Sequence, residues 1–247
     1  MKTINTRRSI RKYSDRAVSD ELLQRLLSEA MRTQTMGNLQ LYSVVVTRDD
    51  EMKHRLAPAH FNQPMVTAAP VVLTFCADTR RTSVWADNRQ AVPGYDNMLS
   101  YQNAATDALL FCQTFCNLAE EEGLGCCFLG TTVYMPQMII DVLKLPRLVM
   151  PVATITLGWP DEQPPLSDRL PLEAIMHRET YTDYTPESID RFYKNKESLD
   201  ENSEFVRINN KQTLAQVYTD CRYTKKDNEA MSEGLIEALR KQGFVKE

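Results

Sequence analysis

Two nearly continuous apolar runs constrain the fold of this chain more than any other feature of its sequence. Val71 to Ala77 reads VVLTFCA and Val152 to Gly158 reads VATITLG, with no charged residue in either run. Strands of this kind are usually buried on both faces, so helices must cover both sides of their sheet. Leu41 to Thr47 is rich in β-branched residues, and it is predicted with Cys126 to Leu129 to add further strands.

Helical patterns interleave with these strands. Ser19 to Arg32 has one apolar face, with Ser19 as a fair N-cap and acidic residues in the first turn. Tyr101 to Glu122 is apolar around most of its circumference, which indicates burial either in the core or in a subunit interface. Pro136 to Leu143 is predicted as a further helix. The chain is therefore expected to be α+β, with helices around a mixed, mostly antiparallel sheet.

The character of the sequence changes after Trp159. Several prolines punctuate a loop, and a polar helical tail follows it. The tail has too little apolar surface to build a core of its own. We therefore expect a core domain over residues 1–180 and a helical C-terminal extension over 181–247, which packs on the core or on a partner subunit.

Composition and charge exclude several classes of function. The net charge is −4, so no globally basic surface for nucleic acid is expected. No run approaches the roughly 18 apolar residues of a membrane span, and the first residues lack the apolar core of a signal peptide. A cytoplasmic location and no membrane partner follow as expectations, and the six cysteines are interpreted as reduced, mostly buried thiols.

Metal and hydrolase chemistry find little support. The three histidines show no metal-ligand spacing, and no G-x-S-x-G motif is present. Cys112 and Cys116 lie one helical turn apart, but no second ligand pair accompanies them, which favours core thiols. No metal site is predicted.

Four polar segments could bind a ligand, although each also has an ordinary structural explanation. Arg7 to Lys12 holds four cations in six residues, which suits either a phosphate or a solvated basic arm. The hydroxyls and carboxamides of Thr33 to Gln40 suit a polar ligand or a plain helix-to-strand loop. Leu129-Gly130-Thr131 would let a ligand approach the backbone, and Arg169 stands in the proline-rich loop.

In this order along the chain, the segments resemble the nitroreductase family, whose members are FMN-dependent, intertwined homodimers. The resemblance spans essentially the whole chain and is closest to the oxygen-insensitive NADPH nitroreductases and flavin reductases with a long C-terminal extension. It is carried by these motifs in sequence: RRSIRKY, GNLQL, NQPMVTAAPVVLTFCAD, GLGCCFLGT, PVATITLGWP and DRLPLEAIMHRETY.

The resemblance implies a set of FMN-binding residues, divided between the two subunits of a dimer. The phosphate and the adjoining ribityl end would be held by Arg7, Arg8, Ser9, Arg11 and Arg169. The ribityl chain and ring edge would be lined by Thr35, Met36, Gly37 and Asn38. Gln63 would bond the polar edge of the ring, and the backbone of Leu129, Gly130 and Thr131 would lie along the cofactor.

The implied reaction is hydride transfer from NADPH or NADH to flavin N5, followed by reduction of a small acceptor in a ping-pong cycle. Nitroaromatics, quinones and free flavins are the expected acceptors, and no side chain is expected to act as a catalytic acid or base. Lys211 is the hypothesised partner of the NADPH 2′-phosphate. Dehalogenation, enoate reduction and a flavin-binding sensor or storage protein without turnover remain alternatives.

Three departures from the family pattern bear on the cofactor. Met36 stands in a loop that is usually serine-rich, and Thr131 replaces the second glycine of a Gly-Gly pair. Ser167 stands where a lysine often precedes the phosphate arginine by two positions. The loss of that lysine is expected to weaken FMN retention without abolishing it.

Overall fold

Four antiparallel strands form a sheet in the order β1-β2-β4-β3 in the computed structural model, which describes residues 3–246. They are β1 (Tyr42–Thr47), β2 (Val71–Asp78), β3 (Gly125–Leu129) and β4 (Val149–Gly158). Every residue of β2 and β4 is buried, which confirms the expectation drawn from the two apolar runs. The central pair of the sheet is therefore enclosed on both faces.

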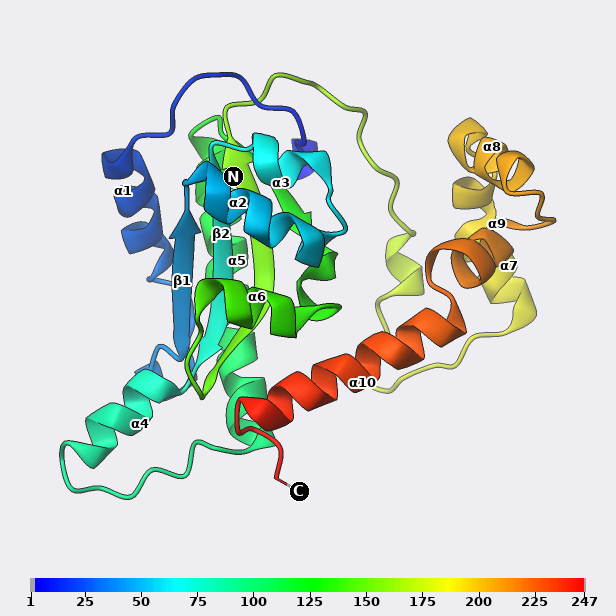
Figure 1. The fold of residues 1–247 in the computed structure, drawn as a ribbon. Coiled ribbons are helices and arrows are strands. Elements are labelled where there is room, and N and C mark those ends of the chain that lie inside the picture. The colour runs from blue at the N-terminus through cyan, green and yellow to red at the C-terminus, as the bar shows by residue number, and fades with distance from the viewer. Residues whose placement is uncertain (1–2, 247) are drawn as a thin grey trace. The chain divides into compact units, whose positions relative to one another are not determined.

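Helices cover the two faces (Figure 1). The long α5 (Met98–Glu121) crosses one face, and α2 (Asp50–Leu56) and α6 (Pro136–Leu143) lie over the other. α1 (Asp20–Ala30) packs beside α5, with its predicted cap Ser19 accepting a hydrogen bond from the Leu22 backbone N–H. The short α3 (Pro64–Ala68) and α4 (Arg80–Asp87) flank β2. The α+β class is confirmed.

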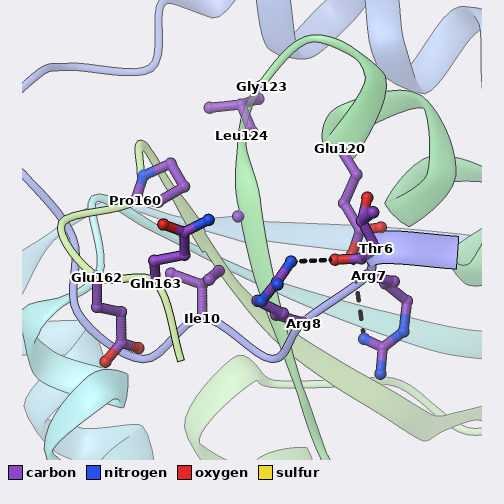
Figure 2. Close-up of a pocket in the computed structure, with 11 residues that line it drawn as sticks. Thr6, Arg7, Arg8, Ile10, Glu120, Gly123, Leu124, Pro160, Glu162 and Gln163 are labelled. Carbon is purple, nitrogen blue, oxygen red and sulfur yellow. Dashed lines mark hydrogen bonds and ion pairs between the residues drawn. The ribbon is translucent and has the colours of Figure 1, made fainter. Parts of the chain in front are cut away.

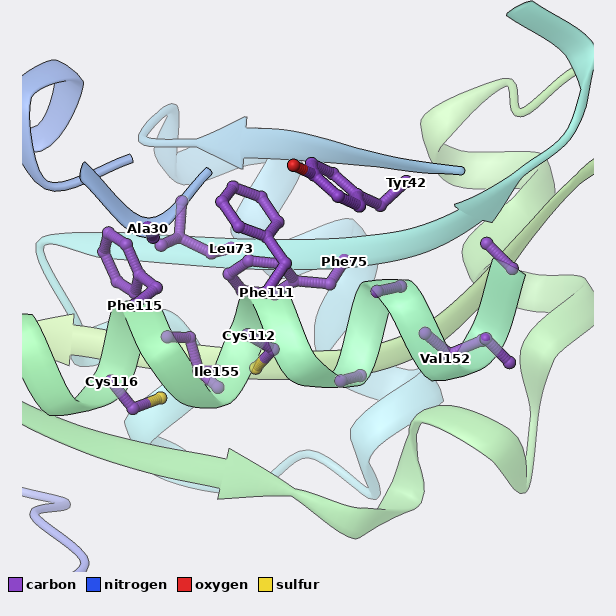
Figure 3. Close-up of a cluster of buried hydrophobic side chains, with 14 of the residues drawn as sticks. Ala30, Tyr42, Leu73, Phe75, Phe111, Cys112, Phe115, Cys116, Val152 and Ile155 are labelled. Carbon is purple, nitrogen blue, oxygen red and sulfur yellow. The ribbon is translucent and has the colours of Figure 1, made fainter. Parts of the chain in front are cut away.

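The inner face of α5 builds much of the core (Figure 3). Phe111 stacks on Tyr42 with ring centroids 4.4 Å apart, and it meets Phe75 edge-on at 5.4 Å. The opposite side of the same helix exposes Leu109 and Leu110, at 42% and 39% of their surface. Burial in the core thus explains only one side of the apolar pattern that wraps this helix.

The chain divides into two compact units. One unit contains the residues up to 165 and those from 231 onward, and the other contains residues 166–230. The second unit carries α7 (Pro186–Glu197), α8 (Asp200–Ile208) and α9 (Leu214–Val217). α10 (Lys225–Lys241) begins in the second unit and ends in the first, where Leu239 and Phe244 join the main core. The end of the polar tail is therefore anchored by apolar side chains.

All six cysteines are free thiols, and five of them are buried; Cys221 is the exposed one. Within residues 3–246, no helix is both long enough and apolar enough to cross a membrane. The same residues contain no cluster of three or more His, Cys, Asp or Glu side chains suited to a metal ion.

Candidate functional site

The N-terminal basic arm is an ordered edge of the sheet. Ser9 forms a parallel bridge with Cys126 of β3, and the Ile10 backbone N–H donates to the Cys126 carbonyl over 3.0 Å. This pairing adds a parallel contact to the antiparallel sheet. Ile10 itself is buried, and a Cβ placed on Gly125 would lie only 2.6 Å from its side chain. The arm packs directly against β3 because Gly125 has no side chain to clash with Ile10.

Arg7 and Arg8 face a hollow of about 410 Å³ that also contains acidic groups (Figure 2). Arg7 Nη1 lies 4.0 Å from Glu120 Oε1, and Arg8 Nε donates to the Pro164 carbonyl over 2.6 Å. Glu162 contributes a second carboxylate to the lining. The hollow therefore brings both signs of charge together, and it is not a purely cationic cradle.

Glu120 is the more unusual of the two acids. Burial raises the pKa of its carboxyl to about 7, although the Arg7 guanidinium works in the opposite direction. Its Oε1 atom is buried without a hydrogen-bond partner. The ion pair with Arg7 thus compensates only in part for the loss of water around this carboxylate.

Arg11 takes a different direction from Arg7 and Arg8. Its backbone N–H donates to Glu162 Oε1 over 2.5 Å, and its exposed side chain reaches the thiol of Cys127. Burial raises the pKa of that thiol, and the Arg11 guanidinium opposes the rise. Because Cys127 stands two residues before Leu129, the Arg11 guanidinium lies near the end of β3, and Arg7 exerts a weaker effect of the same sign on the Cys127 thiol.

The backbone at the end of β3 opens into free space. Leu129 is buried, whereas Gly130 is exposed, and a Cβ added to Gly130 would meet no atom within 4 Å. Thr131 turns inward instead, with its hydroxyl 2.8 Å from Nδ1 of the fully buried His60. The threonine that replaces the family's second glycine therefore keeps its side chain within the protein, away from solvent.

His60 also connects this segment to Gln63. The Gln63 backbone N–H donates to the His60 carbonyl over 3.1 Å, and Gln63 then begins α3. Burial lowers the pKa of His60 to about 4, so the imidazole is neutral near neutral pH. A neutral His60 thus joins two of the predicted ring-binding segments through one side-chain and one backbone hydrogen bond.

A single buried carboxylate organises the predicted loop of residues 35–38. Asp107 of α5 accepts hydrogen bonds from the Thr35 hydroxyl (2.5 Å), the Met36 N–H (2.9 Å) and the Leu41 N–H (3.1 Å). The Thr35 hydroxyl also accepts from the Gln40 N–H, so it is committed within the loop. Met36, Gly37 and Asn38 form the exposed short helix at its tip.

The remaining predicted residues lie in the second unit. Arg169 is exposed, and its guanidinium donates to the carbonyls of Ser167 and Asp168. Lys211 Nζ lies 3.0 Å from Asp220 Oδ2, and this hydrogen bond raises the lysine pKa. A 2′-phosphate at Lys211 would therefore compete with an existing partner, and both assignments stay predictions.

Asp107, His60 and Glu120 are structurally important groups that the sequence analysis did not single out. Asp107 is a lone acid within an apolar helical stretch, which is a signal that could have identified a buried, fully paired carboxylate. In the sequence His60 is one of three histidines without metal-ligand spacing, and nothing marks it as a buried hydrogen-bonding group. Glu120 stands among other acids at the end of α5, where nothing in the sequence distinguishes it.

The arrangement at the end of β3 fits a flat ligand that carries an anionic group. Gly130 leaves its backbone accessible, Gln63 begins the segment that His60 joins to Thr131, and Arg11 supplies a cation close to the same strand. Arg forks pair well with phosphate oxygens, and an open glycine backbone permits close contact with a ring. These residues therefore suit a flavin mononucleotide.

Comparison with known proteins identifies the family of the chain. The model of the nitroreductase family matches residues 4–159. The chain is 30% identical to an FMN reductase [NAD(P)H] of Bacillus subtilis (strain 168) over 99% of this chain and 97% of that protein. It is also 30% identical to an oxygen-insensitive NADPH nitroreductase of Salmonella typhimurium, over 70% of this chain and 71% of that one.

Solved structures agree with this result. A protein of Bacteroides fragilis NCTC 9343 is 60% identical over the full length of both chains, with a TM-score of 0.98. A nitroreductase from B. subtilis is 25% identical over 98% of each chain, with a TM-score of 0.84. The order of the motifs, the fold and the extent of these matches lead to one conclusion: the chain belongs to the nitroreductase family.

Proposed function

We propose that the protein is an FMN-dependent NAD(P)H oxidoreductase that reduces nitroaromatics, quinones or flavins in a ping-pong cycle. The observation that carries the proposal is the open backbone of Gly130 at the end of β3, which His60 and Thr131 link to the Gln63 segment and near which Arg11 lies. The names of the relatives, an FMN reductase and an NADPH nitroreductase, support the same chemistry.

Bound FMN would supply the two-electron hydride chemistry, and the residues of this chain would hold and orient it. Gly130 would let the ring lie against the backbone, and Gln63 would hydrogen-bond its polar edge. Arg11 is the exposed guanidinium of the basic arm proposed for the phosphate, and Arg169 stays the further partner that the family resemblance implies. Arg7 would bind the phosphate only by leaving Glu120.

The exposed tip of the 35–38 loop would contribute from the second subunit. In the family that the chain resembles, residues of both subunits surround FMN, and Met36, Gly37 and Asn38 are presented at the surface. Leu109 and Leu110 on the outer side of α5 provide an apolar surface that a second copy of this chain would cover. We therefore propose a homodimer with its cofactor between the subunits.

A titration with FMN tests the cofactor site, and Gly130→Ala sharpens the test. The added methyl meets no atom of the protein, so thermal stability without FMN should match the wild type. FMN affinity should fall about tenfold or more, because the methyl would occupy the space assigned to the ring. Gly94→Ala is the matched control, since its added Cβ also meets nothing within 4 Å. Equal FMN affinity in wild type and Gly130→Ala would contradict this placement of the ring.

Stopped-flow reduction by NADH and by NADPH, followed by reoxidation with a panel of acceptors, tests the activity itself. Reduction by either nucleotide and rapid reoxidation by a quinone, a nitroaromatic or free FMN is the expected result. A protein that binds FMN but is not reduced would be a binder without turnover. Preference for halogenated or enoate acceptors would identify a different reaction on the same fold.

A further inference from the structure

Two consecutive non-glycine residues adopt left-handed backbone angles directly before Gln63. Phe61 has φ 55° and Asn62 has φ 54°, and they end the short helix Ala57–His60. Glycine is the usual residue at such a helix end, because a Cβ is strained there, and strain is greater for a bulky side chain than for asparagine. A glycine at position 61 would make the same turn more easily, so the presence of phenylalanine needs another explanation.

Core packing does not provide that explanation. Phe61 is 48% exposed, whereas the preceding His60 is fully buried. The Phe61 ring instead lies near the ring of Tyr134, with centroids 6.2 Å apart and planes tilted by 32°. A strained backbone thus holds an aromatic ring at the surface next to a second one. Strained residues of this kind concentrate at binding and catalytic sites.

Both rings belong to segments that flank the proposed flavin site. Phe61 stands two residues before Gln63, and Tyr134 stands four residues after Gly130. The Tyr134 N–H donates to the Thr131 carbonyl over 3.0 Å, which fixes the end of the Gly130–Val133 turn. The buried hydrogen bond between His60 and Thr131 joins the two segments. The hydrogen bonds that join these two segments therefore hold the backbone of Phe61 and Tyr134 in the same part of the molecule as Gln63 and Gly130.

We propose that Phe61, supported by Tyr134, is a specificity-determining surface on which a planar aromatic electron acceptor lies while it is reduced. The inference rests on the function proposed above. Aromatic rings attract one another in offset or tilted arrangements, so an exposed ring favours flat aromatic ligands over compact ions. With a quinone as acceptor, NAD(P)H and one proton provide two electrons and two protons, giving the hydroquinone and NAD(P)⁺.

Phe61→Gly tests this inference without endangering the fold, because glycine removes the ring and also relieves the strained backbone angle. The measurement is kcat/KM for 1,4-naphthoquinone and for ferricyanide, a compact acceptor without a ring, in the FMN-loaded enzyme. We expect the ratio of naphthoquinone to ferricyanide kcat/KM to fall roughly 2- to 12-fold, the range typical of one aromatic contact. The melting temperature should equal or exceed that of the wild type.

Asn62→Gly is the matched control, since it relieves the neighbouring left-handed residue and keeps the Phe61 ring. Its ratio should equal that of the wild type. An unchanged ratio in Phe61→Gly, or an equal fall in both variants, would overturn the role of Phe61 while leaving the oxidoreductase function intact. A wild-type protein that binds no FMN or reduces neither acceptor would overturn the proposed function and the inference together.

Discussion

At the scale of single residues, burial decides the behaviour of the charged groups near the basic arm. Glu120 retains only 11% of its side-chain exposure, and its pKa rises to about 7 despite the neighbouring Arg7. In the unfolded chain the same carboxyl would titrate near its ordinary value of 4.5. Holding Glu120 ionised in the folded protein therefore lowers the free energy of unfolding at high pH.

Glu120→Gln should reveal this cost through its pH dependence. Between pH 4.5 and 7 the folded protein binds more protons at Glu120 than the unfolded chain, so wild-type stability falls as pH rises through this window. At pH 8 the variant should gain on the order of 2 kcal/mol in free energy of unfolding, and near pH 4.5 the gain should vanish. Urea unfolding at both pH values is the measurement.

The exposed Glu51→Gln on α2 serves as the control for the change of charge. It should not reproduce the difference between the two pH values. A destabilised Glu120→Gln variant at pH 8 would mean that the ion pair with Arg7 outweighs desolvation of the carboxylate.

At the scale of elements, one residue of α5 determines the shape of the loop before β1. Asp107 is almost fully buried and accepts hydrogen bonds from both ends of the segment Thr35–Leu41. Within that segment Gly37, Asn38 and Gln40 have positive φ angles between 53° and 56°. The tip of the loop is thus held by a carboxylate in the adjacent helix as well as by its own turn residues.

Asp107→Ala should release this loop. Three donors would lose their acceptor, and we expect the free energy of unfolding to fall by about 3 kcal/mol or more. Limited proteolysis should cut between Thr35 and Gln40 in the variant sooner than in the wild type. The free energy of unfolding of Asp107→Asn should lie between those of the wild type and Asp107→Ala. The asparagine amide oxygen can still accept a hydrogen bond, whereas its NH₂ group cannot accept from the remaining donors. Asp141→Asn, on the surface of α6, is the control; equal stability of Asp107→Ala and this control would refute the assignment.

At the scale of the whole molecule, α5 links the core of one chain to the proposed second subunit. Its inner face carries Phe111 and Phe115 into the aromatic core, while Leu109 and Leu110 remain partly exposed on the other side. Covering such partly exposed leucines with a partner subunit would remove apolar surface from water, which is favourable. The cofactor assignment depends on this association, because the exposed loop tip would serve the partner's site.

Leu109→Lys should weaken the dimer by burying a charge in the interface. Sedimentation at micromolar concentration should then shift from dimer toward monomer, and FMN affinity should fall with it. Val46→Lys changes another exposed apolar residue, on the edge strand β1, and should leave both measurements unaltered. A wild-type monomer that binds FMN tightly would contradict the proposed interface.

The sequence by itself determined the elements and the family. The apolar runs at 71–77 and 152–158 are short, nearly continuous and rich in β-branched residues, which favours strands buried on both faces over a buried helix. The four strands, and the three helices predicted with bounds (α1, α5 and α6), appear within a few residues of those bounds, whereas α2, α3 and α4 were not predicted. The motif order likewise indicates the nitroreductase family without reference to any tertiary contact, since it depends only on residue type and spacing.

Only the tertiary structure decided the directions of the side chains. Four cations in six residues predict one basic segment, yet Arg7 turns toward Glu120 while Arg11 reaches Cys127. The inward turn of Thr131 depends on His60, which lies 71 residues away in sequence. Asp107 similarly acts on a loop 66 to 72 residues away. Such contacts arise when distant segments pack together, and local periodicity carries no information about which distant partner a polar side chain will meet.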